Sequence, residues 1–410
     1  MKNTSLFIYT FLIFVFSIWT YSLTDRNLVL FQWSPYLQFQ NVMWSIPVTT
    51  VTTAYSALIL LLFSTYFLIL HQSRKDKEAS QPWILVCLIF GISVFAYNAL
   101  SHDIFNYIFN AKMVIQYSAN PHIQTALDFV SDPWIRFMHN VHTPAPYFYG
   151  WTALSLIPYV FGFGKFLSTW LLFKAWSLLG LTALVYIQWK FLEIFTQDKK
   201  TRIKNWLMFA LNPLVIIETI MVGHNDAWMM TFALGGLYVL MNKKYKQSIP
   251  LMFISFTFLL ISISMKYVTV VLLPVWMVLV FSQQEYDFKK HLQGNAQKFI
   301  DVVTKNVMEY SSILLLLPLL TSRSQWFHPW YLIWSLTFLP FIKWKWLQAL
   351  LISLSFSSML RYIPWMWNGA FEYTSDIHFQ QRMITWVIGL LGVLMWLGWR
   401  RTHSPTKIGR

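Results

Sequence analysis

Apolar segments recur along the whole chain, and polar residues gather in the short stretches between them. Segments of about 17 to 25 apolar residues can cross a bilayer as helices. The pattern therefore predicts an all-α transmembrane helical bundle of about 11 to 13 spans. The expected spans are 6–23, 48–70, 83–100, 166–189, 206–222, 226–241, 249–265, 267–282, 311–322, 329–342, 346–361 and 383–399.

Two apolar stretches need a separate interpretation. The stretch 151–163 has only 13 residues, so we expect a short, re-entrant or interfacial helix there. The first stretch follows Lys2 in the manner of a signal peptide, but no small-residue cleavage site comes after it. We expect it to be retained as the first helix of a single membrane-embedded domain, residues 1–410.

Composition supports a membrane protein and argues against a nucleic-acid partner. The chain is 56% hydrophobic and 11% charged, against about 25% charged residues in a soluble domain. A net charge of +15 would suit nucleic acid if it formed one patch, but the cations lie in short clusters between apolar runs. This is the positive-inside pattern of a protein surrounded by membrane lipids.

The same charges predict which side of the membrane each loop faces. With the N-terminus in the cytoplasm, cytoplasmic segments hold 22 of the 31 Lys and Arg residues. The polar stretch 101–150 then faces outward, and we expect a multi-pass protein of the plasma membrane. The remaining cations are Arg26, Lys112, Arg136, Lys165, Lys174, Lys266, Arg323, Arg361 and Arg382.

The stretch 101–150 is the best candidate for an extracytoplasmic catalytic loop. It holds four of the ten His residues, three Asp residues and only two cations. Polar groups are costly at membrane depth, so this cluster indicates contact with water or a polar substrate. Four polar residues recur at helical spacing and would share one face of an interfacial helix: Asp103, Asn106, Tyr107 and Asn110.

Asp103 heads this face and could accept a proton from a sugar hydroxyl as a general base. The adjacent His102 could do the same, and Asn106 and Tyr107 would bind substrate. A structural alternative remains open, because Ser101 and Asp103 also suit the capped start of a helix.

Two further outer turns carry polar candidates. The turn 223–226 contributes His224, Asn225 and Asp226, which either bind substrate or only form the turn. In the turn 323–331, Trp330 and Tyr331 either bind substrate or belong to the aromatic belt at the interface.

Cations on the outer side are disfavoured by the charge pattern and are therefore candidates for binding a phosphate. We expect Arg323, with His328 and Lys266 or Arg382, to bind a phosphate head group. Ordinary solvated loop charge is the alternative for each of them. His139 and His142 have a spacing that a metal site could use, but two ligands do not make a site.

These motifs, in this order, resemble the membrane-embedded GT-C glycosyltransferases, especially those that use polyprenyl-phosphate-linked mannose. The resemblance covers roughly residues 80–340. It is carried by His102–Tyr107, Asn120-Pro121-His122, Thr143–Trp151, Asn212-Pro213, Gly223–Asp226 and His328–Tyr331.

The resemblance implies a GT-C-like fold with an acidic catalytic base in the first large outer loop, at Asp103 here. It implies inverting transfer of a hexose, with mannose expected, from polyprenyl phosphate to a lipid or glycan acceptor on the outer face. An Asp-x-Asp motif is absent because Phe105 follows Asp103 by two residues. We therefore expect no metal and no cofactor. The chain also departs from the simplest layout, since two spans precede residue 80.

A transporter or lipid-linked glycan flippase is the main alternative, because such proteins also have many spans and polar residues at the midplane. The sequence contains no internal repeat, and only Lys174 lies deep in a predicted span. A non-catalytic assembly subunit is a third possibility, against which Asp103 argues.

Overall fold

The computed structural model describes residues 3–26, 28–30, 32–73, 82–242, 248–283, 295–321, 327–369 and 374–403. Within these ranges the chain forms helices and no strand, which confirms the predicted all-helical class. Eleven cations of the predicted cytoplasmic clusters lie outside the described residues: Lys2, Arg74, Lys75, Lys77, Lys243, Lys244, Lys246, Lys289, Lys290, Lys407 and Arg410.

The helices follow the apolar segments of the sequence. The α-helices are α1 (Asn3–Trp19), α2 (Ser34–Ser45), α3 (Val48–Gln72), α4 (Pro82–Ser93), α5 (Asp103–Tyr117), α6 (Tyr149–Val160), α7 (Phe166–Phe195), α8 (Lys199–Ala210), α9 (Pro213–Ile216), α10 (Asp226–Met241), α11 (Ile249–Met265), α12 (Leu273–Gln283), α14 (Asn295–Lys305), α15 (Val307–Leu316), α16 (Leu332–Leu336), α17 (Lys345–Leu360), α18 (Tyr362–Trp367), α19 (Ser375–Met383) and α20 (Gly389–His403). Short 3₁₀-helices include η1 (Thr20–Leu23), η2 (Ala126–Phe129), η3 (Ile135–Phe137), η6 (Tyr267–Leu272), η7 (Leu317–Leu320) and η9 (Pro329–Tyr331), and π-helices are η4 (Ile217–Met221) and η10 (Ile384–Ile388).

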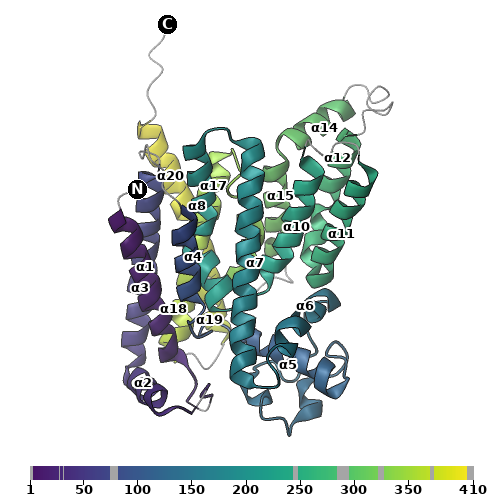
Figure 1. Cartoon of the computed structure of the whole chain (residues 1–410). Coiled ribbons are helices and arrows are strands. Elements are labelled where there is room, and N and C mark those ends of the chain that lie inside the picture. The colour runs from purple at the N-terminus through teal and green to yellow at the C-terminus, as the bar shows by residue number, and fades with distance from the viewer. Residues whose placement is uncertain are drawn as a thin grey trace.

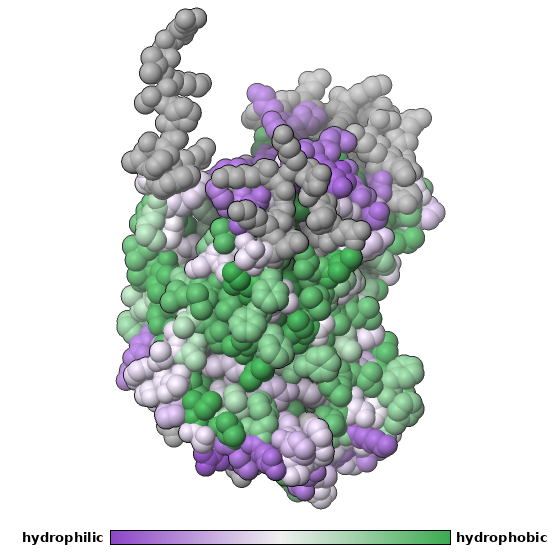
Figure 2. All heavy atoms as spheres, turned by 60° about the vertical axis from the view of Figure 1, so that its left-hand side comes forward, coloured by the Kyte–Doolittle hydropathy of each residue, from purple (hydrophilic) through white to green (hydrophobic). Residues whose placement is uncertain are grey.

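These helices form one bundle whose two ends differ. The start of α1, the end of α20 and α14 lie at one end, while α2, α5 and α6 lie toward the other (Figure 1). Figure 2 shows an apolar band across the middle of one face, with hydrophilic residues toward both ends. Apolar side chains such as Phe7 (71% exposed) and Phe253 (69%) also remain exposed on the bundle, as expected of a surface that lipid covers.

Length and composition identify four helices in the described ranges that can each cross a membrane, or six if two bent pairs count as spans. Four shorter apolar helices occupy other predicted spans, with bounds Trp83–Ser93, Asp226–Met241, Ile249–Met265 and Tyr267–Ser282. The stretch 151–163 contains the short helix α6, as predicted. The hydrophobic pattern did not predict α2, because its apolar and polar residues are mixed.

One predicted span is broken in the middle, at Asn212-Pro213. Proline lacks an N–H donor, so α8 ends there and the chain resumes after a bend of 52°. Carbonyls freed near this break still need partners in an apolar interior. The hydroxyls of Tyr9 and Tyr66 donate to the carbonyls of Leu211 and Met208, each at 2.7 Å. The break is therefore held from two neighbouring helices, α1 and α3.

Candidate active site

A large pocket opens among the elements at the α2 and α5 end of the bundle. Its volume is about 1840 Å³. The walls come from the η1–α2 connection, the start of α5, the α11–η6 junction, η9 and the α17–α18 junction. The predicted site residues that line it are Asp103, His102, Asn106, Tyr107, Lys266, His328, Trp330 and Tyr331.

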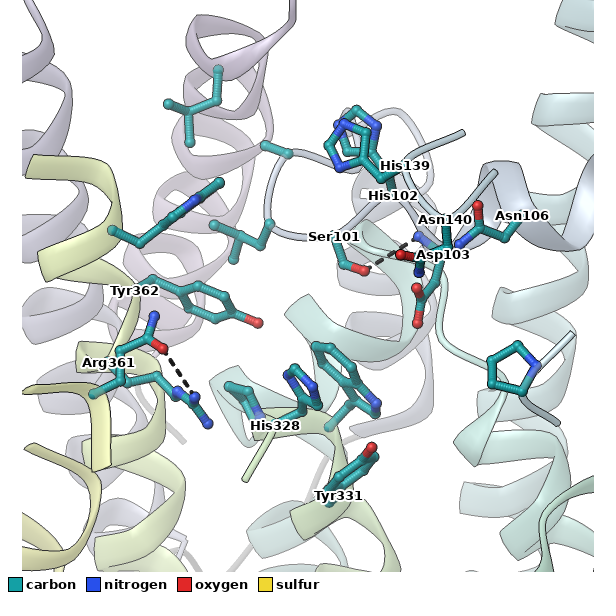
Figure 3. Close-up of a pocket in the computed structure, with 18 of the residues that line it drawn as sticks. Ser101, His102, Asp103, Asn106, His139, Asn140, His328, Tyr331, Arg361 and Tyr362 are labelled. Atoms are coloured by element: carbon teal, nitrogen blue, oxygen red, sulfur yellow. Dashed lines mark hydrogen bonds between the residues drawn. The ribbon is translucent and has the colours of Figure 1, made fainter. Parts of the chain in front are cut away.

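Asp103 points its carboxylate toward the interior of this pocket (Figure 3). The helix start is satisfied by Ser101, whose hydroxyl accepts the N–H of Asp103 at 3.3 Å. The carboxylate of Asp103 instead lies 3.4 Å from the ring of His224, and 30% of the side chain remains exposed. The Asp103 carboxylate therefore does not cap the helix and is left available to a ligand.

The polar face that Asp103 heads points into the protein rather than toward the membrane interface. Asn106 lines the pocket at 6% exposure. One turn further along α5, the Asn110 amide donates to the hydroxyl of Tyr147. The predicted interfacial helix is thus a buried one, because the loop 118–148 and helices α6 and α7 cover it.

The turn 223–226 lies behind the pocket wall and is almost completely buried, at 1% exposure for His224 and Asn225 and 0% for Asp226. The sequence predicted an outer turn between two spans and did not indicate that the turn would be buried. Gly223 adopts φ +94°, and a Cβ there would come within 2.8 Å of the Ile104 side chain. Glycine is required because the turn packs directly against the first residues of α5.

Glu218 lies on the other side of His224. Its carboxylate is 3.4 Å from the ring, and both side chains are 0% exposed. Burial lowers the pKa of His224, but the two flanking carboxylates outweigh burial and raise it above its usual value. For Asp103, burial acts to raise the pKa, but interaction with His224 and the charge of Lys266 lower it below the usual 3.8.

Lys266 approaches the pocket from the junction of α11 and η6. Its ammonium lies 2.8 Å from the carboxylate of Asp226, which also accepts the indole N–H of Trp334 at 2.5 Å. The Lys266 side chain keeps 18% exposure. Asp226 therefore anchors a cation at the pocket surface.

A stack of three rings connects two sides of the site. The imidazole of His224 lies on Trp330 at 3.8 Å between ring centres, and Trp330 lies on His328 at 4.3 Å. Arg361 lies beside His328 (Figure 3) and is 3% exposed. Burial and then the charge of Arg361 lower the pKa of His328 to about 3, so this imidazole is neutral at physiological pH.

His102 belongs to a different part of the pocket wall. Its ring stacks on His139 at 3.7 Å, away from the Asp103 carboxylate (Figure 3). Burial and the neighbouring His139 lower the pKa of His102 to about 4. Asn140 of the same loop and Asp25 and Arg26 of the η1–α2 connection also line the pocket.

Of the predicted phosphate ligands, one falls outside the described residues and another lies away from the pocket. Arg323 lies outside the described residues. Arg382 is an exposed residue of α19 and does not line the pocket. His139 contacts His102 rather than His142, and the described ranges contain no group of three or more His, Cys, Asp or Glu side chains suited to a metal ion.

The pocket also contains residues that the sequence did not predict to belong to the site. Arg361, Tyr362 and Gln381 line the pocket, and the guanidinium of Arg361 donates to the Gln381 side chain at 3.2 Å. Arg361 did carry a signal, since the charge pattern predicts it to be a cation on the disfavoured outer side. Tyr362 and Gln381 carried none, because only the packing of α18 and α19 brings them to the site.

Other polar residues of 101–150 stabilise the loop itself. Lys112 lies 2.6 Å from Asp132, with side-chain exposures of 7% and 1%. Asp132 also accepts the hydroxyl of Tyr117 at 2.6 Å and the N–H of Trp134 at 2.8 Å. This buried ion pair holds the loop against α5 and has no direct part in the pocket.

A comparison with protein families matches residues 7–282 to the N-terminal domain of alpha-(1->6)-mannopyranosyltransferase. No curated protein and no solved structure matches the chain. The family match includes α5, the 101–150 loop, the turn 223–226 and Lys266, the elements that surround Asp103. It is consistent with the GT-C resemblance, and the chain belongs to the alpha-(1->6)-mannopyranosyltransferase family.

Proposed function

We propose that this protein transfers mannose from a polyprenyl-phosphate donor to a glycan acceptor on the extracytoplasmic face, with Asp103 as a metal-independent general base. The observation that carries the proposal is the Asp103 carboxylate in a pocket that also presents Lys266, His328 and Arg361. Family membership favours mannosyl transfer over a transporter or flippase.

In the proposed reaction the acceptor hydroxyl oxygen attacks C1 of the mannose. The new C1–O bond forms as the bond between C1 and the phosphate oxygen breaks, and the hydroxyl proton passes to Asp103. The polyprenyl phosphate leaves with the bonding electron pair. Attack from the face opposite the phosphate inverts C1, so an α-linked product requires a β-linked donor.

The donor phosphate would bind between the cations of the pocket. Lys266 and Arg361 supply positive charge, and neutral His328 can donate one hydrogen bond from its ring. Next to Lys266 the pocket is bounded by apolar residues of η6 and η7, namely Val268, Val271 and Pro318. An apolar wall beside a phosphate site suits a prenyl chain.

The acceptor would enter from the side of the pocket opposite these cations. The stacked rings of His102 and His139 provide a flat surface there, and Asn140, Asp25 and Arg26 supply groups that bind hydroxyls. Asp103 lies between the two sides (Figure 3), where an acceptor oxygen and the donor C1 would meet.

The proposed side of the membrane rests on charge. The 22 cations of the predicted cytoplasmic segments belong to loops that alternate with the outer ones. In the structure α5 lies at the end of the bundle opposite α14, which carries two of these cations, Lys298 and Lys305 (Figure 1).

A reconstituted transfer assay tests the proposal. Purified protein in liposomes would receive radiolabelled polyprenyl-phosphate mannose, polyprenyl-phosphate glucose or GDP-mannose, with a glycan acceptor. We expect transfer from the mannosyl lipid alone, unchanged after chelation of divalent metals. Use of GDP-mannose, or loss of activity on chelation, would contradict the donor or the metal-independent mechanism. Movement of lipid-linked sugar across the bilayer without a new glycosidic bond would support the flippase alternative.

A further inference from the structure

We propose that Glu218 and His224 are positioning residues that hold the Asp103 carboxylate, so that the site depends on a buried Asp103–His224–Glu218 triad. The inference rests on the proposed role of Asp103 as the base. Its starting point is geometric: the His224 ring lies 3.4 Å from a carboxylate oxygen on each side, Asp103 in the pocket and Glu218 behind it.

The backbone brings Glu218 to this place through a local irregularity. Residues 217–221 form the π-helix η4, in which the N–H of Val222 donates to the carbonyl of Ile217. The N–H of His224 then donates to the carbonyl of Glu218 at 3.2 Å. A π-helix widens one turn and redirects the side chains in it, and such turns are frequent at functional sites. Glu218 therefore binds His224 through both its backbone and its carboxylate.

Burying the carboxylate of Glu218 costs free energy, and the fold itself gives no reason for a charged group at this position. A fully buried carboxylate is unfavourable unless it is paired, and Glu218 is 0% exposed in an apolar bundle. The Glu218 carboxylate contacts His224 and Tyr362, whose hydroxyl donates to it at 2.9 Å. Trp330 covers the face of the His224 ring, where an indole attracts a positive charge. Two carboxylates and an aromatic face together favour a protonated His224.

A protonated His224 has two effects on Asp103. It fixes the direction of the carboxylate, and it favours the ionised form that a general base needs. Other charged or titratable groups also act on Asp103: Lys266 and His328 from the pocket wall, with Arg361 beyond His328. Among the ion pairs of the described residues, His224 is the one partner of the Asp103 carboxylate. Glu218 is the carboxylate that pairs with the other nitrogen of the His224 ring.

The test is Glu218→Gln, which keeps size and can still accept the Tyr362 hydroxyl. Without the charge of Glu218, His224 deprotonates more easily and Asp103 loses its neighbouring cation. We expect kcat to fall about 10- to 100-fold because the base is less well oriented, with the donor KM changed less than about 2-fold. The acidic limb of the pH profile should move up by about one pH unit.

A matched control is Glu309→Gln on α15. Glu309 is also buried, at 1% exposure, and accepts the N–H of Lys343 at 2.6 Å, but it does not line the pocket. The control should leave the pH profile unchanged. A purely structural role for Glu218 would lower the amount of active protein without moving the profile, and that result would overturn the inference.

A second readout does not depend on catalysis. Dicyclohexylcarbodiimide labels protonated carboxyl groups, and peptide mass spectrometry can follow labelling of Asp103 against pH. The midpoint should rise by about one unit in Glu218→Gln and not in Glu309→Gln. If the wild-type protein fails to transfer mannose but the midpoint still moves, the proposed function fails and the triad stands. If the midpoint does not move, the triad is refuted. His224→Gln should raise the labelling midpoint of Asp103 by the same amount. This variant replaces Glu218→Gln in the test if Glu218→Gln does not fold.

Discussion

Asp103 presents a carboxylate to the pocket that Lys266, His328 and Arg361 also line, so it is the first residue to change. Asp103→Asn preserves size and helix-start preference but removes the proton acceptor. We expect turnover to fall by about 10²–10⁴-fold with normal expression. His102→Ala should instead alter acceptor binding, because His102 stacks on His139. Full activity in Asp103→Asn together with loss of turnover in His102→Ala would move the base to His102.

The pH dependence of transfer follows from the same carboxylate. Interaction with His224 and Lys266 overcomes burial and holds the pKa of Asp103 below 3.8. The proposed base is ionised above that pKa. As pH falls through it, the carboxylate is protonated and can no longer accept a proton. The acidic limb of kcat should therefore lie below about pH 4, provided the protein is folded there by circular dichroism. A limb near pH 6.5 would point to a histidine as the base.

The next prediction concerns the side chains that we propose bind the donor phosphate. Arg361→Gln should lower kcat/KM for the donor about 10- to 150-fold, the equivalent of a charged hydrogen bond worth about 1.5–3 kcal/mol. Arg136→Ala is a suitable control, since Arg136 is an exposed cation that does not line the pocket. Arg323→Ala and Arg382→Ala test the ligands predicted from sequence. Donor use that depends on Arg382 but not on Arg361 would locate the phosphate elsewhere.

Among the structural elements, the turn 223–226 depends on one glycine. Gly223→Ala places a Cβ within 2.8 Å of Ile104 at φ +94°. The left-handed backbone and the contact together should destabilise the protein by about 1–3 kcal/mol and displace α5. Gly91→Ala is the control, because a Cβ there meets nothing within 4 Å. Thermal unfolding in detergent compares the two; equal midpoints would mean that the turn relaxes freely.

The loop 118–148 depends on the ion pair between Lys112 and Asp132. Asp132→Asn leaves Lys112 buried without a counter-charge and should destabilise the loop by about 3 kcal/mol. Asp128→Asn, at an exposed helix cap, should have a much smaller effect. Limited proteolysis of the loop provides the measurement, and equal cleavage of both variants would contradict the role of the pair.

The stability supplied by Asp132 should also depend on pH. Burial raises its pKa, but Lys112, Tyr117 and the Trp134 N–H lower it below 3.8. The stabilisation is therefore present at neutral pH and is lost as pH falls through this lowered value. Resistance to protease should decline only in that acidic range.

The last prediction concerns the orientation of the entire bundle in the membrane. In a Cys87→Ser background, Val130→Cys places a thiol at a residue with 69% exposure in the loop that we propose faces outward. An impermeant maleimide should label it in intact cells. Lys298→Cys, on α14 at the opposite end, should react only after permeabilisation. The reverse pattern would invert the proposed topology.

Local patterns were sufficient for the long apolar helices, although not for the mixed helix α2. An apolar run must form a helix in lipid because its backbone groups have no other partners. For this reason the expected spans coincide with α1, α3, α7 and α10–α12, and Pro213 marks the break after α8. Asp103 could be selected for a related reason: few carboxylates occur in so apolar a chain, and this one heads a polar helix face.

Only the tertiary structure decided which polar residues meet. Arg361 and Tyr362 reach the site of Asp103 because α17 and α18 pack against α3 and η9, contacts that no short-range pattern encodes. The sequence identified 223–226 only as a turn between two spans, and packing against Ile104 buries it behind the pocket. Hydrophobic spacing specifies how each helix is made, whereas the partners of a buried charge depend on how distant helices fit together.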